Sequence, residues 1–269
     1  MKRLISYIAI TLLVSIFALS NMSPTVLAQK QLPTRSSLLI WTSRDSGSAE
    51  QKRSVSGKST PFIVHEFSLP EAASGAFSIA IGPDKNLWFT ESDGNRIGRI
   101  TPKGIITEFP LQNANSFPYS IVTGSDGNLW FTEYNGNKIG RITPQGMLAE
   151  FTLATANSNP YGITAGPDGN LWFAESNNNR IGRITPNGTI TEFVLPSVNS
   201  FPTFIISGPG NKLWFTEGSA NKIGSITTHG TITTFKLPAP GSDPYAIVTG
   251  PDGNLWFTEY TSNRIGYIV

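Results

Sequence analysis

Five of the six tryptophans in this 269-residue chain recur every 42 residues, at Trp88, Trp130, Trp172, Trp214 and Trp256. Each lies in one repeated motif, which at 250–259 is Gly-Pro-Asp-Gly-Asn-Leu-Trp-Phe-Thr-Glu. Each unit contains four short runs rich in β-branched and aromatic residues, separated by Gly, Pro, Asn and Asp. A period in the forties with four such runs predicts the blades of an all-β propeller. Helical repeats would need uninterrupted amphipathic runs of about ten or more residues.

The ends of the repeat region predict how the ring closes. The last unit stops at Val269 after three strand-like runs, and 62–70 has the fourth-strand pattern seen at 189–196. We therefore expect 62–69 to pair with 264–268 and to complete five four-stranded blades without an open edge. The alternative is a shortened member of a family with a larger ring, which would stay open unless two chains associate.

The chain is expected to have three parts. Residues 1–28 are typical of an export signal, because Lys2 and Arg3 precede an apolar stretch and Val26-Leu27-Ala28 offers small residues for cleavage. Residues 29–61 are rich in Ser, Lys and Arg and predict a flexible basic tether. Residues 62–269 form the propeller. We expect a secreted protein that is not a membrane protein once the signal is removed.

Composition excludes several functions. The chain has no cysteine, which removes disulfide scaffolds, thiol nucleophiles and cysteine-bound metals. Residues 62–269 carry 12 Lys and Arg against 16 Asp and Glu, so we expect no nucleic-acid partner despite the basic pI of 8.8. Both histidines, His65 and His229, are expected on the surface, and no Gly-x-Ser-x-Gly motif supports a serine nucleophile. We expect a monomer.

Two repeated sets of side chains are expected on the face of the ring where each first strand begins, called here the top face. The linkers entering the first strands end mostly in Pro-Tyr, and the second strands end in Glu. A circle of phenols beside a circle of carboxylates can bind a divalent cation, a polyol or a peptide. The candidate ligand-binding residues are Tyr119, Tyr161, Glu91, Glu133, Glu175 and Glu217.

Both sets also have a purely structural interpretation. Each Glu is followed five residues later by Arg or Lys, as in Glu91 and Arg96, which predicts a repeated ion pair bracing a loop. A tyrosine after proline at the start of a strand is also ordinary packing. The residues alone leave these alternatives open, and the ligand on the top face can be a small molecule, a glycan or a peptide.

The units resemble those of the virginiamycin B lyase (streptogramin B lyase) family over about 62–269. The motif at 250–259 and Asn-Lys-Ile-Gly-Arg-Ile-Thr-Pro at 137–144 carry the resemblance. It implies a seven-bladed ring and a carbon–oxygen lyase that linearises cyclic depsipeptide antibiotics by elimination. In that reaction Mg²⁺ polarises the substrate carbonyl and a histidine, which follows an acidic residue and proline, removes a proton.

The matching positions in this chain are Tyr119, Tyr161, Thr203 and Tyr245. Only Asp243-Pro244-Tyr245 keeps the acidic residue, so the resemblance implies Asp243 and Glu259 as Mg²⁺ ligands and Tyr245 as the catalytic residue. A phenol with a pKa near ~10 is a poor base at neutral pH. Two functions follow: a Mg²⁺-dependent lyase, or a non-catalytic propeller that binds its ligand on the top face. A sugar-lactone hydrolase is a third and weaker alternative.

Overall fold

The computed structural model describes residues 64–269, so the expected signal at 1–28 and tether at 29–61 lie outside the described residues. The chain divides into two units, Met1–Phe62 and Ile63–Val269, and the second holds all nineteen described strands. The described residues form no α-helix, and accordingly none of their segments is a helix able to cross a membrane. The prediction of an all-β propeller is confirmed for 64–269.

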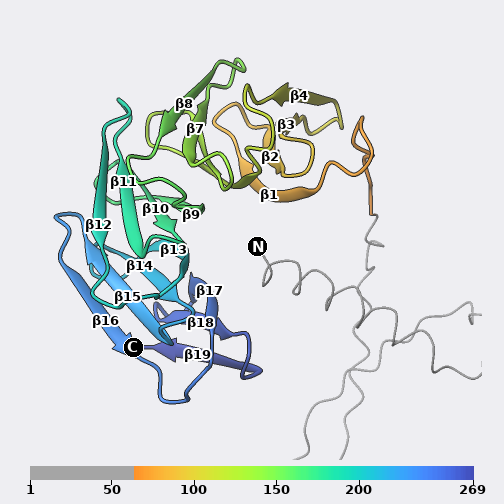
Figure 1. Ribbon diagram of the computed structural model, residues 1–269. Coiled ribbons are helices and arrows are strands. Elements are labelled where there is room, and N and C mark those ends of the chain that lie inside the picture. Colours follow the sequence, from red (N-terminus) through yellow and green to blue (C-terminus); the bar gives the residue numbers. More distant parts are fainter. Residues whose placement is uncertain (1–63) are drawn as a thin grey trace, which may run out of the picture. The chain divides into compact units, whose positions relative to one another are not determined.

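Five antiparallel sheets follow one another along the chain, and within each sheet every strand pairs with the next in sequence (Figure 1). Blade 1 contains β1 (Ala76–Ile81), β2 (Leu87–Glu91), β3 (Arg96–Ile100) and β4 (Ile106–Pro110). Blade 2 contains β5 (Pro118–Thr123), β6 (Leu129–Glu133), β7 (Lys138–Ile142) and β8 (Leu148–Thr152). Blade 3 contains β9 (Pro160–Ala165), β10 (Leu171–Glu175), β11 (Arg180–Ile184) and β12 (Ile190–Val194). Blade 4 contains β13 (Pro202–Gly208), β14 (Lys212–Glu217), β15 (Lys222–Thr227) and β16 (Ile232–Lys236), and blade 5 contains β17 (Pro244–Thr249), β18 (Leu255–Glu259) and β19 (Arg264–Ile268).

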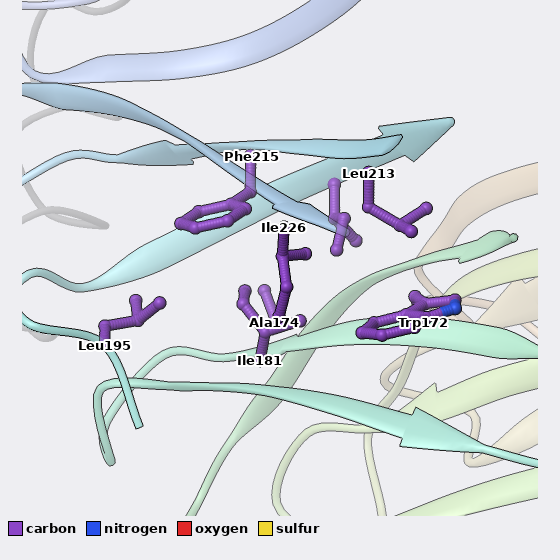
Figure 2. Close-up of a cluster of buried hydrophobic side chains, with 8 residues drawn as sticks. Trp172, Ala174, Ile181, Leu195, Leu213, Phe215 and Ile226 are labelled. Carbon is purple, nitrogen blue, oxygen red and sulfur yellow. The ribbon is translucent and has the colours of Figure 1, made fainter. Parts of the chain in front are cut away.

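The hydrophobic core lies between successive blades rather than within one sheet. Figure 2 shows the cluster between blades 3 and 4, where Trp172 and Ile181 of one sheet meet Leu213, Phe215 and Ile226 of the next. Each such interface buries the same repeat positions, so Trp88, Trp130, Trp172 and Trp214 pack blade against blade. Burying one large apolar side chain contributes about 1.5–3 kcal/mol. The apolar residues of the 42-residue motif therefore mainly hold neighbouring blades together.

The repeated glycine of the third strand has a steric reason. In blade 3, Phe173 of β10 lies directly over Gly182 of β11, and a methyl group at Gly182 would come within 2.1 Å of the ring. The same contact recurs between Phe131 and Gly140. Glycine therefore follows isoleucine in the third strand because a phenylalanine ring fills the space that a larger side chain would need.

The expected closure of the ring is wrong. Blade 5 has three strands, and 64–69 form no strand. Instead Phe67 covers Gly104 in the β3–β4 turn of blade 1, just as Phe109 of β4 covers Gly146 of blade 2. Residues 64–69 thus lie beside blade 1, at the place of an outer strand of a preceding blade. Figure 1 shows blade 1 and blade 5 at opposite ends of an open arc, which keeps 64–69 away from β19.

Candidate functional site

Three of the predicted top-face tyrosines meet at the starts of the first strands. Tyr119 is the second residue of β5, Tyr161 of β9 and Tyr245 of β17. The Tyr161 hydroxyl is hydrogen-bonded to the hydroxyls of both Tyr119 and Tyr245. The first strands of successive sheets are neighbours, which brings Tyr119 of blade 2 beside Tyr161 of blade 3. Tyr245 of blade 5 reaches Tyr161 past blade 4. We call Tyr119, Tyr161 and Tyr245 the tyrosine cluster.

Other aromatic rings surround the tyrosine cluster. The Phe77 ring centroid lies 3.9 Å from that of Tyr119, and the Tyr134 centroid lies 5.9 Å from that of Tyr161. The Phe204 ring lies edge-on to Tyr161 and Tyr245, with centroids 5.6 and 5.2 Å away. Tyr260 is 6.2 Å from Tyr245 and lines an open hollow of about 270 Å³ together with Glu259, Asn263, Arg264 and Ile265. Sequence reasoning missed these four rings as site residues.

Blade 4 differs from its neighbours at this site. Thr203 occupies the repeat position of the tyrosines but is buried, and its hydroxyl is 2.8 Å from that of Thr216. The next residue, Phe204, contacts the tyrosine cluster instead. A Pro-Thr-Phe sequence in place of Pro-Tyr was the signal that could have revealed this one-residue shift.

Tyr119, Tyr134 and Tyr161 are hydrogen-bond donors rather than bases. Burial raises the pKa values of Tyr119 and Tyr161 well above 10, and that of Tyr134 is raised for the same reason. These groups therefore stay protonated at neutral pH. The two described histidines, His65 and His229, are exposed, and His229 lies in the β15–β16 turn. The expectation that both histidines lie on the surface is confirmed.

The glutamates that end the second strands lie beneath the loops. Glu91, Glu133, Glu175 and Glu217 have no exposed surface, and no carboxylate oxygen of theirs has a hydrogen-bond partner among the described residues. Burial raises the pKa of Glu133 to about 7 and that of Glu175 to about 7; it also raises those of Glu91 and Glu217. Glu259 differs, because the hydroxyls of Ser242 and Ser262 lower its pKa.

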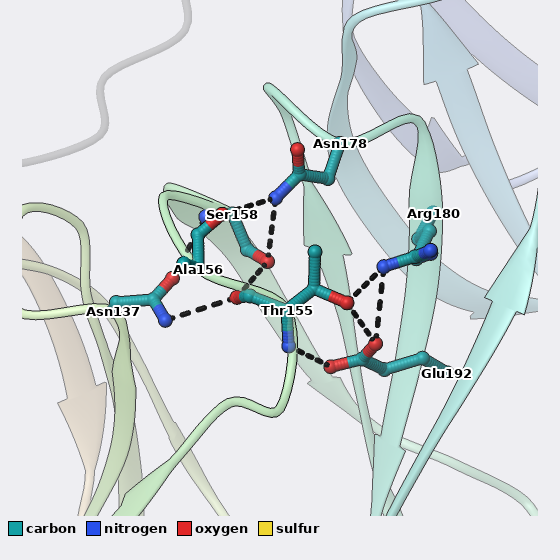
Figure 3. Close-up of polar contacts among 7 residues, drawn as sticks. All are labelled: Asn137, Thr155, Ala156, Ser158, Asn178, Arg180 and Glu192. Atoms are coloured by element: carbon teal, nitrogen blue, oxygen red, sulfur yellow. Dashed lines mark hydrogen bonds and ion pairs between the residues drawn. The ribbon is translucent and has the colours of Figure 1, made fainter.

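The expected ion pairs between each Glu and the basic residue five positions later are wrong. Lys138 pairs with Glu150 of β8 at 2.5 Å, and Arg180 pairs with Glu192 of β12 at 3.3 Å. Arg96, Lys138 and Arg180 thus reach across to the fourth strand. Lys222 of blade 4 instead donates a hydrogen bond to the Ser197 hydroxyl. Figure 3 shows how Arg180 and Glu192 also hold the linker through Thr155, whose hydroxyl donates to Glu192 at 2.6 Å.

The expected Mg²⁺ ligands, Asp243 and Glu259, each accept a hydrogen bond from a side-chain hydroxyl. Asp243 accepts a hydrogen bond from Thr261 at 3.5 Å, and burial raises the pKa of its carboxyl. Glu259 accepts a hydrogen bond from Ser262 at 2.8 Å. Within 64–269 there is no group of three or more His, Cys, Asp or Glu side chains able to hold a metal ion. Mg²⁺ usually keeps several waters and needs only one or two carboxylates, so binding at Asp243 and Glu259 stays a prediction, and we derive no chemical step through it.

The blades and the tyrosine cluster define a β-propeller with an aromatic, phenol-bearing site where its first strands begin. The model of the Virginiamycin B lyase family matches residues 62–269. The chain belongs to the virginiamycin B lyase family.

Solved structures agree with this assignment. Selenomethionine-substituted virginiamycin B lyase from Staphylococcus aureus is 49% identical, with a TM-score of 0.74 over 76% of this chain and 70% of that chain. A streptogramin B lyase is 44% identical, with a TM-score of 0.72 over 76% of this chain and 67% of that chain. A catalytically inactive histidine-to-alanine variant of the Staphylococcus aureus enzyme, with quinupristin, is 49% identical over the same shares and has a TM-score of 0.74.

Proposed function

We propose that this propeller binds a cyclic depsipeptide of the streptogramin B class at the tyrosine cluster. One observation carries the proposal: Tyr119, Tyr161 and Tyr245, from three different blades, converge with their hydroxyls in contact. Their hydroxyls can donate hydrogen bonds to the ester and amide carbonyl oxygens of such a ligand. The rings of Phe77 and Phe204 offer apolar surface to its side chains. The relative solved with quinupristin supports this ligand class.

The site selects by hydrogen-bond donation and aromatic packing. Tyr161 is buried and bonded to two other phenols, so its hydroxyl is held in place before any ligand arrives. A positioned donor costs less conformational entropy on binding than a mobile one. Tyr260 connects the cluster to the hollow on blade 5, where a bulky ring substituent can lie. The aromatic residues thus bind and orient the ligand.

Elimination by this chain is the second candidate function, favoured by its family membership and by the named activity of its relatives. The reaction needs a base beside the substrate ester. The described phenols Tyr119 and Tyr161 are protonated at neutral pH, and the replacement of a histidine leaves the relative catalytically inactive. No histidine of 64–269 lies at the tyrosine cluster. These observations favour binding over catalysis by the described residues.

Quinupristin binding to the whole chain tests the proposal. Isothermal titration calorimetry should show binding that Tyr161→Phe weakens about fivefold, since one hydrogen bond contributes about 1 kcal/mol. Tyr267→Phe is the matched control, because Tyr267 lies on β19 and is 56% exposed. Equal affinities for both variants and the parent would refute the site.

Mass spectrometry of the same mixtures, with and without Mg²⁺, separates the two functions. A product of unchanged mass but new chromatographic retention means elimination, and the second candidate is then correct. Intact ligand recovered from a binding-competent protein supports the first.

We also propose that the protein is exported through 1–28, and amino-terminal sequencing of the exported protein should give Gln29.

A further inference from the structure

Blades 1, 2 and 3 each hold a fourth-strand glutamate against a basic residue of the third strand. The ion pairs are Arg96–Glu108, Lys138–Glu150 and Arg180–Glu192, with N–O distances of 3.1, 2.5 and 3.3 Å. In blade 3 the linker that enters the blade adds two donors, because the hydroxyl and the backbone N–H of Thr155 donate to Glu192 at 2.6 and 3.3 Å (Figure 3). The repeat thus contains a site for one carboxylate, and in these blades the chain itself fills it.

Blade 4 keeps the donors of this site and lacks the carboxylate. Lys222 occupies the repeat position of Arg180. Ser197 occupies that of Thr155, whereas Thr234 replaces the fourth-strand glutamate. The Lys222 ammonium donates to the Ser197 hydroxyl at 2.7 Å, and it forms no ion pair with any residue of 64–269. Ser197 is only 8% exposed. A charged donor and a buried hydroxyl therefore remain where the other blades bind a carboxylate.

Blade 4 also adds a second lysine at this place. Lys236 lies at a position that is not charged in blades 1 to 3, where it is Pro110, Thr152 or Val194. It is directly opposite Lys222 in the β15–β16 pairing, so both side chains stand on the same face of the sheet. Like charges at directly opposite positions destabilise a strand pair. An anion bound beside both lysines would relieve this repulsion.

The buried Glu217 at the end of β14 does not replace the missing acid. Burial raises its pKa despite the nearby Lys222, and its carboxylate oxygens have no hydrogen-bond partner among the described residues. The equivalent glutamates of blades 2 and 3 stand in the same relation to their own third-strand cation. Those two blades still bind a fourth-strand carboxylate. A second acidic group is therefore absent from blade 4 alone among the four-stranded blades.

We propose that blade 4 binds the carboxylate group of a small organic acid at Lys222, Lys236 and Ser197. The two oxygens of the ligand take the place that the Glu192 carboxylate has in blade 3, with the Ser197 backbone N–H as a further donor. Charge-assisted hydrogen bonds of this kind at a partly exposed site correspond to a Kd of about 1 mM. The proposal goes beyond the tyrosine cluster, because third and fourth strands form this site and first strands form the cluster.

Acetate is the probe, since it presents a single carboxylate like that of a glutamate side chain. The whole chain is titrated with sodium acetate at constant ionic strength, and a proton–nitrogen correlation spectrum follows the backbone amide of Ser197. This signal should shift and saturate with a Kd of about 1 mM. Sodium chloride lacks the paired oxygens and should not reproduce the shift. The proposal is overturned if no saturable shift occurs up to about 50 mM acetate, or if chloride gives the same shift.

Two lysine variants test which cations bind the acetate. Lys222→Gln should raise the Kd about tenfold or more, because the charged donor nearest Ser197 is lost. Lys236→Gln should raise it about threefold, because this side chain is exposed and its charge is screened. The matched control is Lys103→Gln, at an exposed lysine in the β3–β4 turn, which should leave the Kd unchanged. Equal Kd values for Lys222→Gln and the control overturn the proposal.

Thr234→Glu restores the carboxylate that the other blades carry. Its side chain should pair with Lys222 and abolish the acetate shift at Ser197, while the thermal midpoint stays at or above that of the parent. A folded Thr234→Glu variant that binds acetate with the parent Kd would mean that the ligand lies elsewhere, which also overturns the proposal.

Discussion

The buried glutamate of blade 2 makes a sharp prediction about stability and pH. Glu133 is fully buried, and neither of its carboxylate oxygens has a hydrogen-bond partner among the described residues. The nearby Ser116 hydroxyl donates to the backbone O of Asn113 at 3.1 Å instead. Burial raises the pKa of Glu133 from 4.5 to about 7, and the repulsion from Glu150 adds to it. The folded chain therefore keeps this carboxyl protonated at a pH where the unfolded chain ionises it.

The sign of the effect follows from linkage. Below about pH 4.5 both states bind the proton, so the full stability is present. As pH rises from 4.5 to about 7 only the unfolded state loses the proton, and the free energy of unfolding falls. A pKa shift of this size corresponds to about 3 kcal/mol in the free energy of unfolding. Glu133→Gln removes the ionisation and keeps the shape, so it should stabilise the protein by up to about 3 kcal/mol at pH 8 and have little effect at pH 4.5.

The free energies of unfolding at the two pH values are measured by urea titration, with tryptophan fluorescence as the signal. Glu259→Gln is the matched control, because Ser242 and Ser262 lower the pKa of Glu259 and its carboxylate stabilises the fold when ionised. That variant should lose stability at pH 8, which is the opposite sign. The reasoning is refuted if Glu133→Gln is no more stable than the parent at pH 8, or if its advantage is the same at both pH values.

Four further substitutions probe the packing. Gly182→Ala places a methyl group 2.1 Å from the Phe173 ring and should lower the free energy of unfolding by about 1–3 kcal/mol, measured by urea denaturation. Arg141→Met removes a hydrogen bond to the next blade and a guanidinium 5.5 Å from a tryptophan ring, and should lower the thermal midpoint at a cost of about 1–2 kcal/mol. Ile163→Ala should cost about 2–5 kcal/mol because its side chain is 6% exposed, whereas Ile79→Ala should cost under about 1 kcal/mol. Similar losses at both isoleucines would contradict the open blade 1 face.

The blades could be predicted from the sequence because the same few side chains set each one. Trp172 and its equivalents recur at one spacing, and the strand boundaries follow from the turns around them. Ring closure could not be predicted in this way. The pattern at 62–69 identifies an outer strand, but the blade it joins depends on the curvature between sheets. That curvature arises from packing at many interfaces, and here Phe67 lies against blade 1.

The tyrosine cluster was predictable in part. Tyr119, Tyr161 and Tyr245 share one repeat position, so their convergence follows from the 42-residue period. Phe204 was missed because blade 4 shifts its aromatic residue by one position and buries Thr203. The ion pairs were also missed, since register places Arg180 opposite Glu175 but its guanidinium reaches Glu192. Side-chain direction at a strand end depends on the loops, which vary more than the strands.

One inter-blade contact is unevenly distributed, and this sets the order in which the arc should open. Arg99, Arg141 and Arg183 each donate to a backbone carbonyl in the turn of the following blade while stacked between two rings. These arginines join blades 1 to 2, 2 to 3 and 3 to 4. Blade 4 has Ser225 at that position, so blade 5 lacks the corresponding link. In a linear array with nearest-neighbour coupling, the weakest junction melts first. Blade 5 should therefore detach as a separate cooperative unit while the other four stay folded.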